Sequence, residues 1–250
     1  MIFRQLFEPE SSTYTYLFGC EDTGLVVLLD PVIDTVERDL ILLHELGLRL
    51  AYTLETHIHA DHLSAARKLK HLVASKIAGP AMDELPCTDF GVSEDRPLAV
   101  GSLAFKPLFT PGHTDTHHSY LIGDGATKRV FTGDALLIDG CGRTDFQSGD
   151  AATLYRSIHE KIFTLPDDTL VYPAHDYNHH HVSTVAQERE RNLRLGAGKT
   201  LADFVQIMAN LNLPYPKKMD FAVPGNRKCG ECPEETPEAL RKLCNLSEQG

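Results

Sequence analysis

The sequence predicts a layered α/β fold in a single domain over residues 1–250. Short apolar runs of strand length alternate with amphipathic segments along the chain. Four of the strand-like runs are followed by a residue that can bind a metal ion, and no internal repeat or change of composition divides the chain. A chain of this length can bury enough surface to fold without the help of disulfides.

The strand-like runs start near the N-terminus. Thr13–Phe18 alternates polar and apolar residues, and Leu25–Leu29 is a continuous apolar run that ends at Asp30. Both patterns are typical of strands. Further strands are expected in Leu50–Thr56, Leu98–Thr110 (one or two), Ser119–Ile122, Val130–Thr132 and Leu170–Tyr172.

Amphipathic segments between these runs predict helices. In Thr35–Leu48 the apolar residues fall roughly on one helical face, after a plausible N-cap at Asp34 or Thr35. The segment after Pro214 is rich in Pro, Lys and Glu, so we expect an irregular tail over about residues 214–250. Further helices are expected in Ser64–Val73, Ala151–Phe163, Val182–Asn192 and Leu201–Leu211.

The composition of the chain argues against some classes of binding partner. The chain has 24 Lys and Arg against 35 Asp and Glu, and this net charge of −11 argues against a nucleic-acid or membrane partner. The N-terminus lacks the pattern of a secretion signal, so we expect a cytoplasmic protein, either a monomer or a homodimer. The six cysteines are scattered, and we expect unpaired thiols even in the Cys229-Gly-Glu-Cys232 motif with Cys244 nearby.

Thirteen histidines make metal chemistry worth testing, because several of them follow predicted strands. Loops at the strand ends of a layered α/β fold meet at one edge, where such folds place their sites. Imidazole and carboxylate groups gathered there suit zinc, iron or manganese better than calcium. The candidate ligands at four strand ends are His57, His59, Asp61 and His62, then His113, then Asp134, and finally His175. His117 is a weaker candidate for a supporting role.

Four motifs carry a resemblance to a known superfamily. THIHADH, TPGHT, FTGD and YPAHD stand in the order and approximate spacing of the metallo-β-lactamase-fold superfamily, which the chain resembles over about residues 10–195. The resemblance implies an αββα four-layer sandwich, in which helices flank two mixed sheets and the metal site lies at one edge. This superfamily includes hydrolases, nucleases and redox enzymes, so the fold alone does not fix the reaction.

One branch that fits is glyoxalase II, a hydroxyacylglutathione hydrolase with two Zn(II) ions. By ligand count alone this is the natural interpretation, with a metal-bound hydroxide as nucleophile. The resemblance would assign one metal to His57, His59 and His113, the other to Asp61, His62 and His175, and Asp134 as the bridge.

The segment after Asp134 resembles a different branch, the persulfide dioxygenase family. ALLIDGCGRTDFQ, over residues 135–147, looks like that family, whereas glyoxalase II usually follows Gly-Cys-Gly-Arg with aromatic residues and a Glu. The likeness extends to about Cys229. It implies one Fe(II) ion per chain, bound by His57, His113 and Asp134. It also implies that other residues orient ligands and water by hydrogen bonds: His59, Asp61, His62 and His175.

This resemblance implies glutathione persulfide and O2 as substrates, with sulfite and glutathione as products. By position in the family pattern, Arg143, Tyr177 and Arg194 are the candidate anchors for glutathione carboxylates, which suit the planar fork of arginine. The family usually has Asn-Pro-Arg where this chain has Asn192-Leu193-Arg194. A non-catalytic alternative is a metal-binding or redox-sensing protein.

Overall fold

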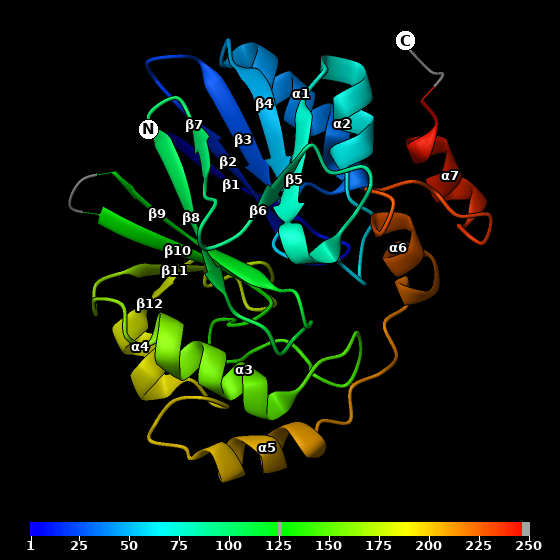
Figure 1. Cartoon of the computed structure of the whole chain (residues 1–250). Helices are drawn as coiled ribbons and strands as arrows, with labels where there is room; N and C mark the ends of the chain where they lie inside the picture. Colours follow the sequence, from blue (N-terminus) through cyan, green and yellow to red (C-terminus); the bar gives the residue numbers. More distant parts are fainter. Residues whose placement is uncertain (125–126, 247–250) are drawn as a thin grey trace. The chain divides into compact units, whose positions relative to one another are not determined.

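The computed structural model describes residues 1–124 and 127–246, and the chain divides into two units (Figure 1). Unit 1 comprises Met1–Val92, Leu98–Leu103 and Tyr215–Gly250. Unit 2 comprises Ser93–Pro97 and Ala104–Pro214. In the described part of the chain, no helix has the length and apolar character that crossing a bilayer requires.

The sheet of unit 1 follows the order of the sequence. Its first three strands are antiparallel and its last four pair in parallel, so the chain has to cross over between successive parallel strands. The carboxyl ends of these parallel strands lie at the same edge of the sheet. The strands are β1 (Ile2–Glu8), β2 (Thr13–Gly19), β3 (Leu25–Leu29), β4 (Arg49–Leu54), β5 (Lys76–Pro80) and β6 (Phe90–Val92).

Two crossover helices cover this sheet (Figure 1). The 3-10 turn η1 (Ile33–Thr35) leads into α1 (Val36–Glu45), and α2 (Ala66–Val73) connects β4 to β5. A second 3-10 turn, η2 (Ala81–Asp83), follows β5. Buried Leu17, Leu28, Leu43 and Leu69 belong to one core cluster of unit 1, so the apolar faces that the sequence predicts do pack together.

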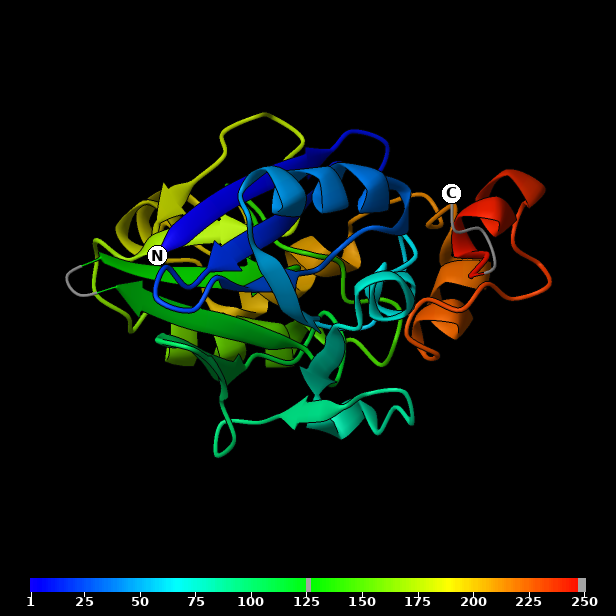
Figure 2. The ribbon, with the colours of Figure 1, turned by 90° about the horizontal axis from the view of Figure 1, so that it is seen from above.

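The C-terminal segment contains two helices, α6 (Met219–Asn226) and α7 (Glu238–Cys244), where the sequence predicts an irregular tail. Figure 2 shows them in orange and red. Phe221 of α6 is buried in the core of unit 1, and Leu240 of α7 packs against that core. The expectation was wrong because Pro224 lies inside α6, and a proline within so short a segment normally indicates a helix break.

The second sheet has the order β12-β11-β10-β9-β8-β7. Strands β8, β9 and β10 form an antiparallel meander, whereas β11 runs parallel to β10 and needs a helical crossover. The strands are β7 (Leu98–Val100), β8 (Leu103–Phe109), β9 (His118–Asp124), β10 (Thr127–Gly133), β11 (Leu170–Pro173) and β12 (Ser183–Thr184). The helices of unit 2 are α3 (Ala151–Ser157), which continues into the π turn η3 (Ile158–Ile162), α4 (Val185–Arg191) and α5 (Leu201–Ala209).

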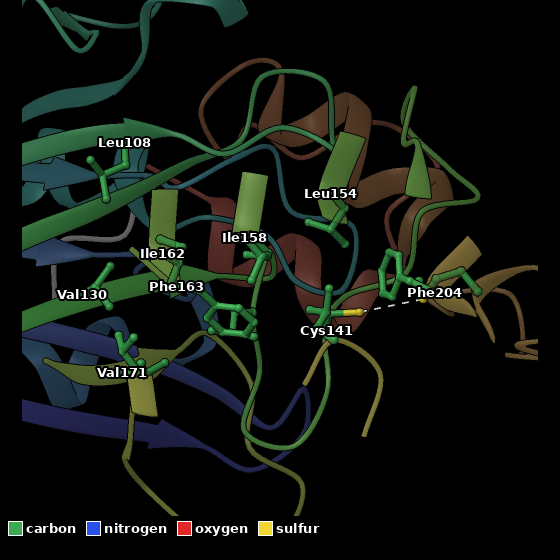
Figure 3. Close-up of a cluster of buried hydrophobic side chains, with 14 residues drawn as sticks. Leu108, Val130, Cys141, Leu154, Ile158, Ile162, Phe163, Val171 and Phe204 are labelled. Atoms are coloured by element: carbon green, nitrogen blue, oxygen red, sulfur yellow. Dashed lines mark hydrogen bonds between the residues drawn. The ribbon is translucent and has the colours of Figure 1, made fainter. Parts of the chain in front are cut away.

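The core of unit 2 forms where the α3–η3 segment packs on its sheet (Figure 3). Leu154, Ile158 and Ile162 recur every four residues, so they share one helical face. Cys141 is buried in the same cluster, with its Sγ 3.8 Å from the Sδ of Met208. Burial raises the pKa of Cys141 to about 11, so its thiol stays protonated at neutral pH.

Four of the six cysteines form disulfides, which corrects the expectation of unpaired thiols. Cys87 pairs with Cys229 and Cys232 pairs with Cys244, with 6.2 and 5.8 Å between the respective Cα atoms. The first pair spans 142 residues, and only the packing of the tail against unit 1 brings its members together. Sequence spacing cannot reveal a pairing of this kind.

We therefore expect two reactive thiols per chain, those of Cys20 and Cys141, when the oxidised protein is denatured without reductant. Alkylation followed by mass spectrometry counts them. After reduction the same measurement should give all six cysteines. Six alkylated residues before reduction would contradict the two pairings.

Candidate metal centre

The loop after β4 begins with a hydrogen-bonded threonine that orients His57. Thr56 donates its N–H to Asp30 Oδ1 (2.7 Å) and its hydroxyl to Asp30 Oδ2 (2.9 Å). The hydroxyl oxygen lies 2.9 Å from His57 Nδ1, and its only hydrogen is already given to Asp30. His57 Nδ1 must therefore donate, which leaves the lone pair on Nε2 for a metal ion.

His59 lies between two carboxylates in unit 1. Its Nε2 is 3.1 Å from Asp30 Oδ1 and 3.3 Å from Glu55 Oε2. Complete burial alone would lower the pKa of His59, but the charges of Asp30 and then Glu55 outweigh that effect and raise the pKa well above its usual value. The ring thus balances buried negative charge beside the loop.

Asp61 and His62 extend this loop. His62 Nδ1 lies 3.0 Å from Asp61 Oδ2, and the hydroxyl of Thr13 donates to the same oxygen at 3.1 Å. Ligand atoms of His59, Asp61 and His62 all lie within 4.8 Å of one another. Among the described residues, His59 Nδ1 and His62 Nε2 are buried and have no hydrogen-bond partner.

Unit 2 brings three predicted site residues together at its own strand ends. His113 follows β8, Asp134 follows β10 and His175 follows β11. His113 Nε2 lies 3.4 Å from Asp134 Oδ2, and His175 Nε2 lies 3.4 Å from Asp134 Oδ1. His113 donates Nδ1–H to the carbonyl oxygen of Arg143 at 2.7 Å, so its Nε2 carries the lone pair.

These distances test whether the residues fit a metal ion. At 3.4 Å the two contacts of Asp134 are longer than ordinary hydrogen bonds. Two ligand atoms each about 2.1 Å from one ion lie roughly 3.0 to 3.4 Å apart when the angle between them is right to tetrahedral. Asp134 Oδ1 is moreover buried without a hydrogen-bond partner among the described residues. The donor set and its spacing therefore fit a metal ion.

The main chain around Asp134 is held from two sides. Asp134 donates its N–H to His117 Nε2 (3.2 Å), and His117 Nδ1 lies 2.9 Å from the Thr110 hydroxyl oxygen. On the other side, Gly142 donates its N–H to the Asp134 carbonyl at 2.7 Å. A Cβ at Gly142 would lie 2.5 Å from that carbonyl oxygen and 2.8 Å from His113 Nδ1, so only glycine fits there.

The three predicted glutathione anchors occupy different surroundings within unit 2. Arg143 forms a two-pronged contact with Asp145 (2.6 and 2.7 Å) and donates to the Pro214 carbonyl. Arg194 donates to the Cys141 carbonyl at 2.6 Å. Tyr177 is 66% exposed, and its ring stacks on that of His175 with 5.8 Å between the centroids.

Three residues that support the loop were missed by the sequence analysis. Asp30 accepts both hydrogen bonds of Thr56, Glu55 contacts His59, and Asn226 bonds to the loop from the C-terminal segment. Asp30 could have been found, because Leu25–Leu29 ends in an ionisable residue like the other four strands. Nothing in the sequence links Asn226 to a loop more than 160 residues away.

The comparisons with known proteins agree with this arrangement. The family model described as "Metallo-beta-lactamase superfamily" matches residues 9–175. The chain belongs to the metallo-beta-lactamase superfamily. The predicted fold class is therefore confirmed, with two mixed six-stranded sheets and flanking helices.

Two relatives that align with nearly the whole chain indicate the branch of the superfamily to which it is most similar among those compared. The mitochondrial persulfide dioxygenase ETHE1 of Homo sapiens is 46% identical over 245 residues, covering 96% of this chain and 91% of that protein. The crystal structure of ETHE1 from Myxococcus xanthus is 51% identical, with a TM-score of 0.88, covering 92% of this chain and all of that one. A cytoplasmic hydroxyacylglutathione hydrolase of Arabidopsis thaliana is 34% identical over 168 residues, 66% of this chain and 64% of that protein.

The chain is thus a homologue of the ETHE1 persulfide dioxygenases, as the segment after Asp134 predicts. This homology implies a metal site, and both units of this metallo-beta-lactamase fold contain His and Asp groups that could contribute to one.

The close packing of Gly142 yields a prediction. Gly142→Ala should weaken metal binding at least tenfold, because the added methyl must push the Asp134 main chain and His113 apart. Chelator competition measures the affinity. Gly123→Ala in β9 is the control, since a Cβ there meets only the Thr127 carbonyl at 3.7 Å. Equal affinities of both variants and the wild type would contradict the packing argument.

Proposed function

We propose that this chain is a persulfide dioxygenase that oxidises glutathione persulfide with O2. One persulfide, one O2 and one water give one glutathione and one sulfite, with the persulfide losing the electrons that O2 gains. The observation that carries the proposal is the 46% identity to human persulfide dioxygenase ETHE1 over nearly the whole chain. The pairing of His113 Nε2 with the Asp134 carboxylate at ligand spacing supports a metal-dependent reaction.

We assign one Fe(II) per chain to His57, His113 and Asp134. Two histidines and one carboxylate leave coordination positions open, as in non-haem iron oxygenases. When bound, ferrous iron would give the persulfide sulfur and O2 a common place to exchange electrons. The assignment is supported in unit 1 by the Nδ1–H tautomer of His57, and in unit 2 by that of His113.

The remaining polar residues would orient these ligands and the water that completes the reaction. His175 Nε2 lies 3.4 Å from Asp134 Oδ1, so its ring limits the positions that this carboxylate can take. We assign His59, Asp61 and His62 to the same role in unit 1, where hydrogen bonds already join them to Asp30 and Thr13. All of these residues except Asp61 are nearly fully buried, so bulk water has little access to their side chains.

The glutathione carboxylates need cationic anchors, since the chain has a net charge of −11. Arg143 can serve if a substrate carboxylate replaces Asp145, which is 55% exposed in its side chain. A substrate carboxylate could accept the same two hydrogen bonds from the guanidinium, so the exchange would keep the bidentate contact. Tyr177 and Arg194 are the other proposed anchors.

A second candidate is a glyoxalase II with two Zn(II) ions. Two observations favour it: His59 Nδ1 and His62 Nε2 are buried without a hydrogen-bond partner in the described residues, and the two rings lie near Asp61. A second metal ion could use these atoms. The shorter and weaker match to the Arabidopsis thaliana hydrolase makes this the lesser candidate.

Metal content measured together with two activities tests the proposal. We expect about one iron per chain and O2 uptake that depends on glutathione persulfide. His113→Ala should lose both the iron and the O2 uptake, because it removes one of the proposed ligands. Two zinc ions with hydrolysis of S-lactoylglutathione, and no persulfide-dependent O2 uptake, would favour glyoxalase II instead.

The proposed anchor gives a separate prediction. Arg143→Ala should raise KM for glutathione persulfide roughly tenfold with little change in kcat, because a contact remote from the reacting sulfur contributes binding in the ground and transition states alike. Steady-state O2 uptake measures both constants. Arg156→Ala, on the exposed side of α3, should leave KM unchanged. An unaltered KM in Arg143→Ala would remove this residue from the set of anchors.

A further inference from the structure

We propose that Asn226, at the end of α6, is a positioning residue for the metal-binding loop. Its carboxamide holds the backbone of His59, His62 and Ser64 in unit 1, and so fixes the loop that begins at His57. The inference rests on the proposed metal site, but not on the identity of the metal or on the reaction.

The carboxamide uses both of its N–H groups and its oxygen on this loop. Nδ2 donates to the carbonyl oxygens of His59 and His62, and Oδ1 accepts from the N–H of Ser64, with all three distances 2.8 Å. Asn226 is only 5% exposed. Only this orientation of the amide works, because the opposite one would set its oxygen against two carbonyl oxygens.

These contacts matter because the loop has little regular structure to pair its backbone. Between the end of β4 and the start of α2, buried carbonyl and N–H groups need partners from elsewhere in the chain. Asn226 supplies three of them within six residues of the loop. Removing a partner leaves such groups buried and unsatisfied, which drives the backbone to rearrange.

The turn that follows Asn226 packs closely against the backbone near Ser64 and the start of α2, and this packing restricts movement of the carboxamide. Gly230 has a φ of +93°, and a Cβ there would lie 2.0 Å from the carbonyl oxygen of Ser64. Arg67, at the start of α2, donates its N–H to the Cys229 carbonyl at 3.0 Å. The Cys87–Cys229 disulfide joins the same turn to the segment after β5.

The geometry thus gives the C-terminal segment a role in the site. The loop carries His57, a proposed ligand, and places His59 beside Asp30 and Glu55, and both residues lie on the loop whose backbone Asn226 holds. Without the three hydrogen bonds of Asn226, the loop should adopt other conformations, and the conformation that can bind metal should be less populated. The apparent metal affinity falls in proportion to the population of that conformation.

Asn226→Asp is the sharpest test, because it changes the donors and hardly the shape. The carboxylate still accepts from the Ser64 N–H, but it loses both donors and faces the carbonyl oxygens of His59 and His62. We expect at least a tenfold loss in affinity for Fe(II), measured anaerobically by chelator competition. Hydrogen exchange of a peptide spanning residues 57–66 should become faster, whereas a peptide from β3 should not change. Asn226→Ala should give the same two effects without the added charge.

Two controls separate positioning from general destabilisation. Asn210→Asp makes the same chemical change at an exposed site at the end of α5, where the amide donates to the Gln206 carbonyl. Leu43→Ala creates a cavity in the core of unit 1 and should lower the Tm, with metal affinity within twofold of the wild type.

Wild-type affinity and exchange in Asn226→Asp would overturn the proposal. The proposal would also be overturned if Leu43→Ala lost as much metal affinity as Asn226→Asp when the two variants show the same decrease in Tm. Because affinity and exchange are measured without substrate, the outcome stands apart from the proposed function. A protein that binds metal normally but does not oxidise persulfide would count against that function alone.

Discussion

A histidine that binds a metal ion through one ring nitrogen needs a hydrogen bond at the other nitrogen, which fixes the tautomer and the orientation of the ring. The candidate ligands in the loops of both units meet this constraint. His113 gives its Nδ1–H to the Arg143 carbonyl, and His57 gives its own to the Thr56 hydroxyl. The tautomer of each ring is thereby fixed, and Nε2 carries the lone pair. The strand ends bring these residues near their partners, but the hydrogen bonds decide which atom each presents.

The partners of these rings are in turn held by groups farther away. In unit 1, Asp30 accepts both hydrogen bonds of Thr56, and Asn226 fixes the backbone of the same loop. In unit 2, His117 and Gly142 hold the main chain of Asp134 from opposite sides. Leaving a buried donor or acceptor unsatisfied costs free energy, so the loss of one of these partners would favour a rearrangement of the backbone. The candidate ligands are therefore positioned by a small residue and a carboxamide as well as by the strand ends.

Much of this could be predicted from the sequence. The strand Leu25–Leu29 has the predicted bounds, and the predicted helix over Ala151–Phe163 is observed as α3 followed by a π turn. A continuous apolar run indicates the strand, and the spacing of apolar residues indicates the helix. The strand Lys76–Pro80 was missed because its Gly and Pro hide the pattern of a buried parallel strand. The candidate His and Asp residues could be picked out because each follows an apolar run.

What the sequence could not provide is long-range pairing. The contacts of Asn226 with the loop and the Cys87–Cys229 disulfide both join segments far apart in the chain, and no local pattern encodes such a meeting. The contact of Arg143 with Asp145 could not be predicted either. A resemblance to a family indicates the position of the arginine, but it does not show which carboxylate the arginine contacts.

The stoichiometry of the reaction tests the central claim most directly. Iron-loaded protein should be given a known amount of glutathione persulfide in an oxygen electrode, with sulfite and glutathione quantified in the same sample. A persulfide dioxygenase should consume one O2 for each sulfite and each glutathione formed. Release of glutathione without O2 consumption, or O2 consumption without sulfite, would contradict the account.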